Sequence, residues 1–308
     1  MTVARRDPPF FVLGAARSGT TMLRLMLNRH PRLAIPPESH FLLPILDELP
    51  IDGPLTLGQR IRAAQIITAH PRFRTWRVSA IDLALAFSAA HSASLSDLVD
   101  CAFRLQITDS RKPRWGDKTP RYYPRWGQLA ALFPESAFIH IIRDGRDVSA
   151  SLERVGWHGP GEAERAAYWA GCVRLAFECH LGLGDKRSII VRYEDLVLDG
   201  APCLRRICSF LGEDFAAPML DFYLDALDHV SGFDGPVHDK LARPPEAGDV
   251  EIWRTAGSPD RLASFEAIAG RELSSAGYPL CFDTASGPEA HNIHSRTDQG
   301  SNQRSIQR

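Results

Sequence analysis

A glycine-rich segment near the N-terminus has the residue types that hold a phosphate group. Residues 14–21 read GAARSGTT, which fits the phosphate-loop pattern G-x-x-x-x-G-K-[ST] except that Thr20 replaces the lysine. The glycines let the backbone turn its N–H groups inward, and a helix beginning after Gly19 adds its positive end. Arg17 supplies a fixed charge, while Thr20 and Thr21 supply hydroxyl donors. The segment therefore predicts an anion site; the alternative is a plain glycine turn between a strand and a helix.

An ATP site requires groups that the sequence does not offer. A P-loop NTPase uses the lysine to bridge the β- and γ-phosphates, a hydroxyl to bind magnesium, and an aspartate that follows an apolar strand. Here the lysine is absent, and in the apolar run FIHIIRD the side chain of Arg143 comes before the aspartate. The loop suits a phosphate but is poorly equipped for metal-assisted phosphoryl transfer. An atypical P-loop kinase and a non-catalytic nucleotide-binding module stay open as alternatives.

Three short apolar runs that read as buried strands position this chemistry. They cover residues 10–14, 137–144 and 188–196. The first leads into the loop with Arg17, the second ends in RDGR from Arg143, and the third ends in RYED from Arg192. Because ligands of open α/β sheets bind beyond the carboxyl ends of the strands, these three charged ends predict one site for an anionic ligand at one edge.

Helical patterns alternate with these strands, which predicts an α/β protein. We expect a P-loop-type three-layer fold with a central, mostly parallel sheet flanked by helices. The first helix would run from Gly19 to about Arg29, and the next would begin at Pro37 with Glu38 in its first turn. The segment 112–124, KPRWGDKTPRYYP, reads as a loop rich in proline, glycine and basic residues. Further helices are expected within an insertion at about 55–110 and at 145–154, 164–177, 202–212 and 258–278.

The motifs at the three strand ends resemble one enzyme family. RSGTT, IIRDGRDVSAS and VRYEDL are similar to segments of the sulfotransferases that use 3′-phosphoadenosine 5′-phosphosulfate (PAPS), in the tyrosylprotein-type and bacterial branches. The resemblance covers most of residues 9–280 and implies transfer of a sulfuryl group to a hydroxyl, or an amine, without a required metal. In the family an arginine at a strand end and a serine eight residues later hold the 3′-phosphate, and here these are Arg143 and Ser151. The alternative for Arg143 is a surface arginine paired with Asp144 or Asp147.

The same resemblance assigns further residues to the donor nucleotide. Arg17 and the amides and hydroxyls of Ser18 to Thr21 would hold the 5′-phosphosulfate. Arg192 or Tyr193 would lie near the adenine or the 3′-phosphate. The segment HDKLARPP resembles a family loop that closes over the 3′-phosphate, with Lys240 or Arg243 as candidates.

The resemblance also implies a base and a charge-compensating group. Glu38, in PPESHFL, is the candidate general base, and His40 is the second candidate because other branches of the family use a histidine. Without the resemblance, Glu38 reads as a first-turn glutamate that complements the helix dipole. Lys118, in WGDKTP, resembles a lysine that stabilises the leaving oxygen; the alternative is a loop lysine paired with Asp117.

Bulk properties limit the remaining classes. The 308 residues carry a net charge of −1, so nothing points to nucleic acid as a partner, and the six cysteines form no C-x-x-C pair. Residues 9–282 would form one domain between a flexible N-terminus at 1–8 and a disordered tail at 283–308. No secretory signal or membrane span is visible, so a soluble, cytoplasmic protein is expected. The insertion and the loop near Trp157 and His158 would line the acceptor pocket, but the acceptor (sugar, lipid, peptide or small molecule) stays open.

Overall fold

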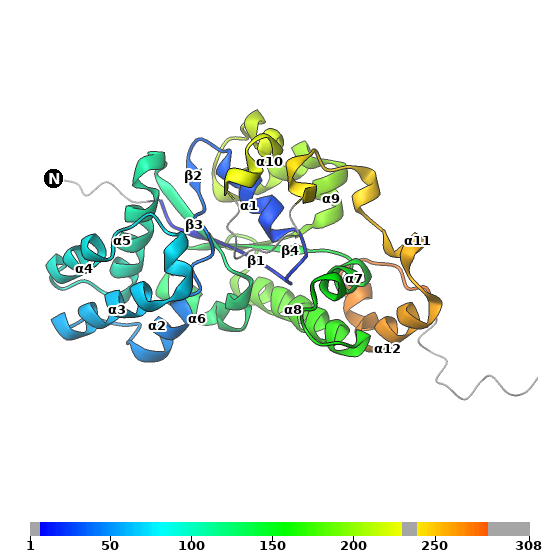
Figure 1. Cartoon of the computed structure of the whole chain (residues 1–308), viewed down its shortest axis with the longest axis horizontal. Helices are drawn as coiled ribbons and strands as arrows, with labels where there is room; N and C mark the ends of the chain where they lie inside the picture. Colours follow the sequence, from blue (N-terminus) through cyan, green and yellow to red (C-terminus); the bar gives the residue numbers. More distant parts are fainter. Residues whose placement is uncertain (1–6, 230–238, 283–308) are drawn as a thin grey trace, which may run out of the picture.

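A parallel sheet of five strands runs through the middle of the protein (Figure 1). The computed structural model describes residues 7–229 and 239–282, so most of the expected N-terminal tail and the whole expected C-terminal tail lie outside the described residues. The sheet has the order β2-β3-β1-β4-β5, and all four pairings are parallel. Its strands are β1 (Phe10–Gly14), β2 (Leu33–Ala34), β3 (Arg114–Lys118), β4 (Ala137–Ile142) and β5 (Ser188–Arg192). The expected α/β fold with a central parallel sheet is confirmed.

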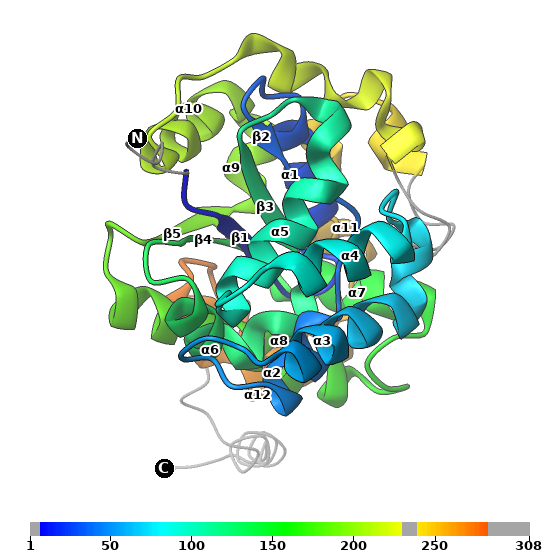
Figure 2. The same cartoon turned by 90° about the vertical axis from the view of Figure 1, so that its left-hand side faces the viewer.

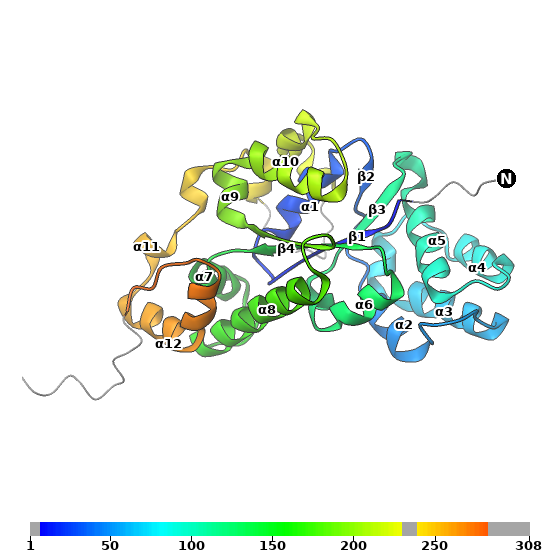
Figure 3. The ribbon, with the colours of Figure 1, turned by 180° about the vertical axis from the view of Figure 1, so that it is seen from behind.

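Helices cover both faces of the sheet, which gives the three layers (Figures 1 and 3). One face packs against α1 (Thr20–Asn28), α9 (Tyr193–Leu198) and α10 (Gly200–Leu211). The other packs against α6 (Trp126–Leu132), α7 (Gly145–Val155), α8 (Glu162–Leu183) and α12 (Pro259–Ser275). Alternation along β1 explains the two cores, because Phe10 and Val12 point into one while Phe11 and Leu13 point into the other.

The expected helical insertion lies to one side of the sheet in Figure 1 and faces the viewer in Figure 2. After α2 (Leu42–Glu48) it contains α3 (Leu57–Ala69), η1 (Pro71–Thr75), α4 (Ala80–Ala89), α5 (Leu95–Ile107) and η2 (Thr108–Ser110). The Phe103 ring of α5 stacks on Trp115 of β3 at a centroid distance of 4.0 Å, and the Trp115 indole N–H donates to Asp100. The insertion is therefore fixed to the sheet through β3.

The loop predicted at 112–124 is wrong over its first half, where the chain forms β3. All five residues of this strand are buried despite its three charges. Arg114 donates to the carbonyl oxygens of Pro8 and Leu211, and Gly116 leaves room for the Phe10 ring. Arg114 is thus satisfied by carbonyl groups far away in the sequence, which a local pattern cannot reveal.

The helix predicted to begin at Pro37 is also wrong, because α2 begins at Leu42. Two features hold residues 37–40 in an extended and turning path. The Pro37 carbonyl accepts a hydrogen bond from the Trp76 indole, and His40 adopts a left-handed backbone with φ of 52°. Glu38 is therefore a loop residue and does not complement a helix dipole.

The later helices lie where the sequence predicts them, and α10 ends at the left-handed Gly212. The C-terminal α12 packs along α8, where Phe265 contacts Trp169 (Figure 3). None of the helices in the described part of the chain combines the length and apolarity needed to cross a membrane. The remaining short helices are η3 (Pro120–Arg125), η4 (Ala217–Leu224), η5 (Ala226–His229), η7 (Asp239–Ala242), η8 (Ala247–Asp249) and α11 (Trp253–Ala256).

Candidate active site

The site forms where the connections of two neighbouring strands leave the sheet in opposite directions. β1 and β4 pair in register, with Gly14 opposite Ile141. The chain continues from β1 into α1 on one face and from β4 into α7 on the other. Such a point in an open parallel sheet leaves a crevice beyond the strand ends, which is where α/β proteins bind ligands.

The loop after β1 presents an uncapped helix end. Arg17 and Gly19 both have left-handed backbones, with φ of 71° and 90°. No side chain in the described part of the chain caps α1, and its first turn contains no acidic residue. The buried Ser18 hydroxyl has no hydrogen-bond partner among the described groups. The free N–H groups of the first turn and the helix dipole therefore suit an anion.

Replacing Gly19 with alanine is expected to destabilise the protein. A side chain at this φ costs about 1–2 kcal/mol, and a Cβ built there would lie 2.4 Å from Cδ2 of Tyr193. Overpacking of this kind adds about 1–3 kcal/mol. Urea unfolding would measure the loss. Gly58→Ala in α3 is the matched control, because its Cβ meets no atom within 4 Å; equal stability of the two variants would contradict the packing described.

Two arginines meet beside this loop. The Arg17 Nε donates to the Ser151 hydroxyl at 3.1 Å, and Arg143 donates to the Arg17 carbonyl at 3.4 Å. Burial, followed by the nearby guanidinium groups of Arg143 and Arg154, lowers the pKa of Arg17. The structure thus brings Arg17, Arg143 and Ser151 together, although they come from β1 and β4 exits 126 or more residues apart.

Arg143 combines a structural role with exposure to the pocket. Its guanidinium pairs with Asp147 at 3.3 Å, donates to the Asp249 carbonyl, and lies 4.4 Å from the centroid of the Tyr193 ring. The pairing with Asp147 is one that the sequence offered as an alternative role. However, the buried Arg143 Nε has no hydrogen-bond partner among the described groups, so it retains a donor.

A pocket of about 110 Å³ adjoins these groups. Arg17, residues 19–22, Arg143, Tyr193 and Lys240 contribute to its lining. Lys240 and Arg243 both bind Oδ1 of Asp249 at 2.8 Å, and together they hold the pKa of Asp249 at about 2 against the opposing effect of burial.

Arg192 lies apart from this pocket. Its guanidinium lies 4.3 Å from the centroid of the Tyr278 ring and 3.7 Å from Glu194. Of the two neighbouring candidates at the end of β5, only Tyr193 lines the pocket.

Glu38 and Lys118 form a buried ion pair at the mouth of the loop. The Lys118 ammonium contacts Glu38 Oε1 and lies 3.4 Å from the Thr21 hydroxyl of α1. The His40 ring binds Glu38 Oε2 at 2.7 Å. Lys118 therefore pairs with Glu38 and not with Asp117, and both candidate bases lie in one cluster beside the phosphate loop.

The charges around Glu38 decide its protonation. Burial by itself raises the pKa of this carboxyl, but the Lys118 ammonium and the His40 ring outweigh burial and hold the pKa well below its usual range. Arg72 adds a further positive charge 3.8 Å from Oε2. Glu38 is consequently ionised at neutral pH, as a proton acceptor must be.

A buried hydrogen-bond network that the sequence did not indicate holds this segment. The Ser39 hydroxyl donates to Asp117 and contacts the Tyr122 hydroxyl at 2.6 Å, while Thr119 also donates to Asp117. Burial raises the pKa of Asp117 to about 6 despite these hydrogen bonds. Because Ser39 follows Glu38 directly, the network fixes the position of the candidate base. The sequence also did not indicate Arg72 or Asp249, because neither lies in a motif.

Other titratable groups read from the sequence are part of the core. Burial, followed by the influence of His180, lowers the pKa of His140 to about 3, and its ring contacts the Tyr123 hydroxyl. Burial raises the pKa of Cys172 and of Cys179 to about 12, as expected of packed thiols. Among residues 7–229 and 239–282, no cluster of His, Cys, Asp and Glu is arranged to hold a metal ion.

The chain has sequence relatives in several organisms. Nodulation protein NoeE of Sinorhizobium fredii is 27% identical over 292 residues, which cover 85% of this chain and 64% of that protein. Protein-tyrosine sulfotransferase A of Caenorhabditis elegans is 25% identical over 215 residues, which cover 67% of this chain and 50% of the relative. The chain thus spans only about half to two thirds of the length of these relatives.

The chain also resembles solved structures in its fold, and one family model matches its sequence. The sulfotransferase domain of the Synechococcus PCC 7002 olefin synthase has a TM-score of 0.68 at 24% identity, covering 91% of this chain and 98% of that one. The domain from the curacin biosynthetic pathway has a TM-score of 0.60 at 22% identity, covering 90% and 100%. These likenesses show the fold. The model described as "Sulfotransferase family" matches residues 8–217, more than half of the chain. The chain therefore belongs to the sulfotransferase family.

Proposed function

We propose that the protein transfers a sulfuryl group from PAPS to a hydroxyl group of an acceptor. The cluster of Arg17, Arg143 and Ser151 beside the uncapped end of α1 carries this proposal. The loop suits one anionic group, and Arg143 provides a second cationic centre with a spare donor. A nucleotide with separate 5′ and 3′ anionic groups matches two such centres. Membership of the family and the protein-tyrosine sulfotransferases among its relatives support the same donor.

The residues near the loop match the needs of sulfuryl transfer. The acceptor oxygen forms a bond to sulfur while the bond from sulfur to the 5′-phosphate oxygen breaks, leaving adenosine 3′,5′-bisphosphate. Glu38 takes the proton of the acceptor hydroxyl, with His40 as the second candidate. Lys118 compensates the charge that develops on the leaving oxygen. An amine acceptor would need the same proton transfer.

Lys118 is shared between the base and the loop. Its ammonium contacts Glu38 and lies near Thr21, so a sulfuryl group held at the loop competes with Glu38 for it. When Lys118 turns toward the sulfuryl group, the pKa of Glu38 rises, because burial is then less opposed. A carboxylate with a pKa nearer neutrality is a stronger base. Donor binding and activation of the base are thus coupled through one side chain.

The two alternatives from the sequence fit the structure less well. A kinase would need a cation at the position of Thr20, and Thr20 is a buried threonine. A non-catalytic module would not need Glu38 and Lys118 near the loop, yet they form an ion pair there. Turnover with magnesium and ATP would favour the kinase over our proposal.

Adenosine 3′,5′-bisphosphate is expected to raise the melting temperature of the protein more than AMP does at equal concentration. Only the bisphosphate engages Arg143 and Ser151 as well as the loop, and a ligand that binds the native state stabilises it according to its affinity. Differential scanning fluorimetry over a concentration series measures both shifts. Equal shifts from the two nucleotides would contradict a 3′-phosphate site.

A further inference from the structure

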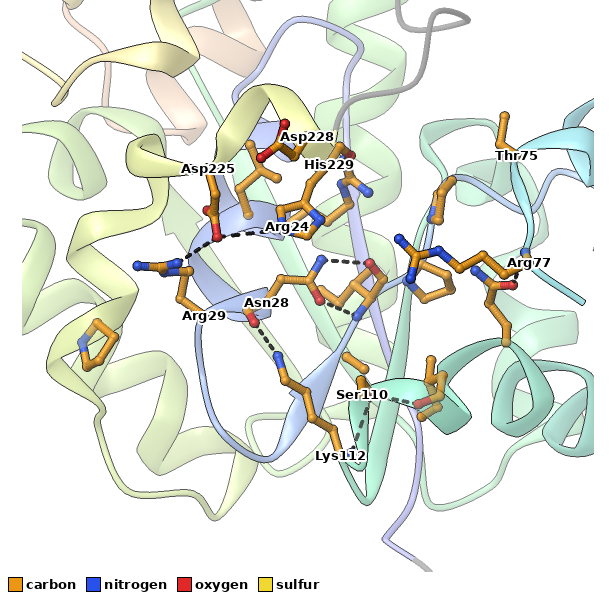
Figure 4. Close-up of a pocket in the computed structure, with 18 residues that line it drawn as sticks. Arg24, Asn28, Arg29, Thr75, Arg77, Ser110, Lys112, Asp225, Asp228 and His229 are labelled. Atoms are coloured by element: carbon orange, nitrogen blue, oxygen red, sulfur yellow. Dashed lines mark hydrogen bonds and ion pairs between the residues drawn. The ribbon is translucent and has the colours of Figure 1, made fainter.

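A second cavity, of about 660 Å³, lies between α1 and the insertion (Figure 4). Its walls are α1, the chain after β2, the end of η1, the end of α5 with the segment after η2, and η4 with η5. Asn28 of α1 joins two of these walls, because its side chain bonds both the N–H and the carbonyl of Ile35. These bonds hold the chain after β2 against α1 at the edge of the cavity.

The lining of this cavity has an excess of positive charge. Arg24, Arg29, Arg77 and Lys112 face two carboxylates, those of Asp225 and Asp228. Arg29 and Asp225 already form an ion pair at 2.6 Å. Among the described lining residues, four cations against two carboxylates leave an excess of two positive charges.

Arg77 and Lys112 carry most of this excess. The Lys112 ammonium donates to the Asn28 carbonyl, and within the described residues no carboxylate forms an ion pair with it. Burial, followed by repulsion from Arg29, lowers the pKa of Lys112. The exposed Arg77 guanidinium has no ion pair in residues 7–229 and 239–282, and it extends from the insertion toward α1 (Figure 4).

The cavity begins next to the groups proposed for transfer. Pro36 and Pro37 line it, and Glu38 follows them in the chain. On the α1 side, Thr21 lies against Lys118, and Asn28 lines the cavity seven positions further along the same helix. An α-helix rises about 1.5 Å per residue, so these two positions are roughly 10 Å apart along the axis.

We propose that the acceptor carries a phosphate group, which Arg77 and Lys112 bind in this cavity while the acceptor hydroxyl lies at Glu38. This inference rests on the proposed function. A phosphomonoester carries a charge of about −1.5 to −2 at neutral pH, which matches the excess of two positive charges better than a single carboxylate does. Arginine and lysine are also the side chains that bind phosphate most readily.

Binding of small phosphates tests this inference without turnover. Protein saturated with adenosine 3′,5′-bisphosphate, so that the donor pocket is filled, is titrated with inorganic phosphate, glucose 6-phosphate and glucose by calorimetry. We expect inorganic phosphate and glucose 6-phosphate to bind, and glucose to bind at least 10-fold more weakly than its phosphate. In the double variant R77Q/K112Q the preference for the phosphorylated sugar should disappear, while the affinity for the bisphosphate stays unchanged. Arg74→Gln, in η1 but outside the cavity lining, is the matched control and should keep the preference.

The outcomes separate this inference from the proposed function. Equal affinity for glucose and glucose 6-phosphate, no binding of inorganic phosphate, or a preference that persists in R77Q/K112Q would overturn the phosphate site. If the bisphosphate itself does not bind, the proposed donor is wrong. In that case, titration of the native protein and of R77Q/K112Q with inorganic phosphate alone still tests whether the cavity binds phosphate.

Discussion

Arg143→Ala is expected to weaken the binding of adenosine 3′,5′-bisphosphate on the order of 100-fold and to change the affinity for AMP only slightly. Hydrogen bonds to charged groups contribute about 1.5–3 kcal/mol each, and about 1.4 kcal/mol corresponds to tenfold in affinity. Arg143 lines the pocket, and its buried Nε has no hydrogen-bond partner among the described groups, so the guanidinium has a donor left for a 3′-phosphate besides its contact with Asp147. Calorimetry with both nucleotides measures the ratio of the two affinities.

The ratio of the two affinities distinguishes loss of a 3′-phosphate contact from general destabilisation of the fold. Removal of Arg143 leaves the buried Asp147 without its ion-pair partner, which by itself destabilises the protein. Arg143→Lys keeps the charge but loses the planar fork, and we expect an intermediate loss of about 10-fold. The nearby exposed Arg154→Ala serves as the control, since it influences Arg17 only at a distance. If both nucleotides weaken equally in Arg143→Ala, the 3′-phosphate assignment is wrong.

Glu38→Gln is expected to lower kcat by about 10²–10⁴-fold, the usual contribution of a general base, and to leave bisphosphate affinity unchanged. Glutamine matches the size of glutamate and can still accept a hydrogen bond from Lys118, so the loop should keep its shape. Steady-state kinetics with a turned-over acceptor and calorimetry with the bisphosphate give the two readouts. Full activity of Glu38→Gln together with inactivity of His40→Asn would transfer the role to His40.

The pH profile gives a second readout for Glu38. A general base works only when deprotonated, so kcat/KM falls as pH drops below the pKa of the base in the free enzyme. Lys118 and His40 hold the pKa of Glu38 low, so kcat/KM should show no acid limb between pH 8 and about 5. An acid limb inside that range would instead argue against Glu38 as the base.

Local patterns predict the parts of this site that follow directly after strands. Three features of the site each follow a short apolar run that ends in glycine or charge. They are the loop before α1, Arg143 after β4 and Tyr193 after β5. In each case the same few residues determine both the element and the exposed group. Parallel pairing then places the ends at one edge without further information.

The parts that could not be predicted depend on partners far apart in the chain. β3 looks polar because Arg114 and Lys118 are charged, and distant partners make its burial tolerable: carbonyl groups and Glu213 for Arg114, and Glu38 for Lys118. The Ser39–Asp117 contact and the walls of the second cavity likewise bring together segments separated by many residues. The periodicity of apolar residues does not indicate such long-range contacts.

The pairing of β1 also has a consequence for how the chain is made. Within the described sheet, β1 is synthesised before the other strands, yet its partner residues begin at Gly116 and Ala137. At roughly 5–20 residues per second, a ribosome needs about 5–25 s to supply them. During that time the apolar run FFVL has no strand to pair with, and non-local parallel pairing is slow even afterwards. Yield during expression should therefore depend on translation speed and on chaperones that cover this nascent segment.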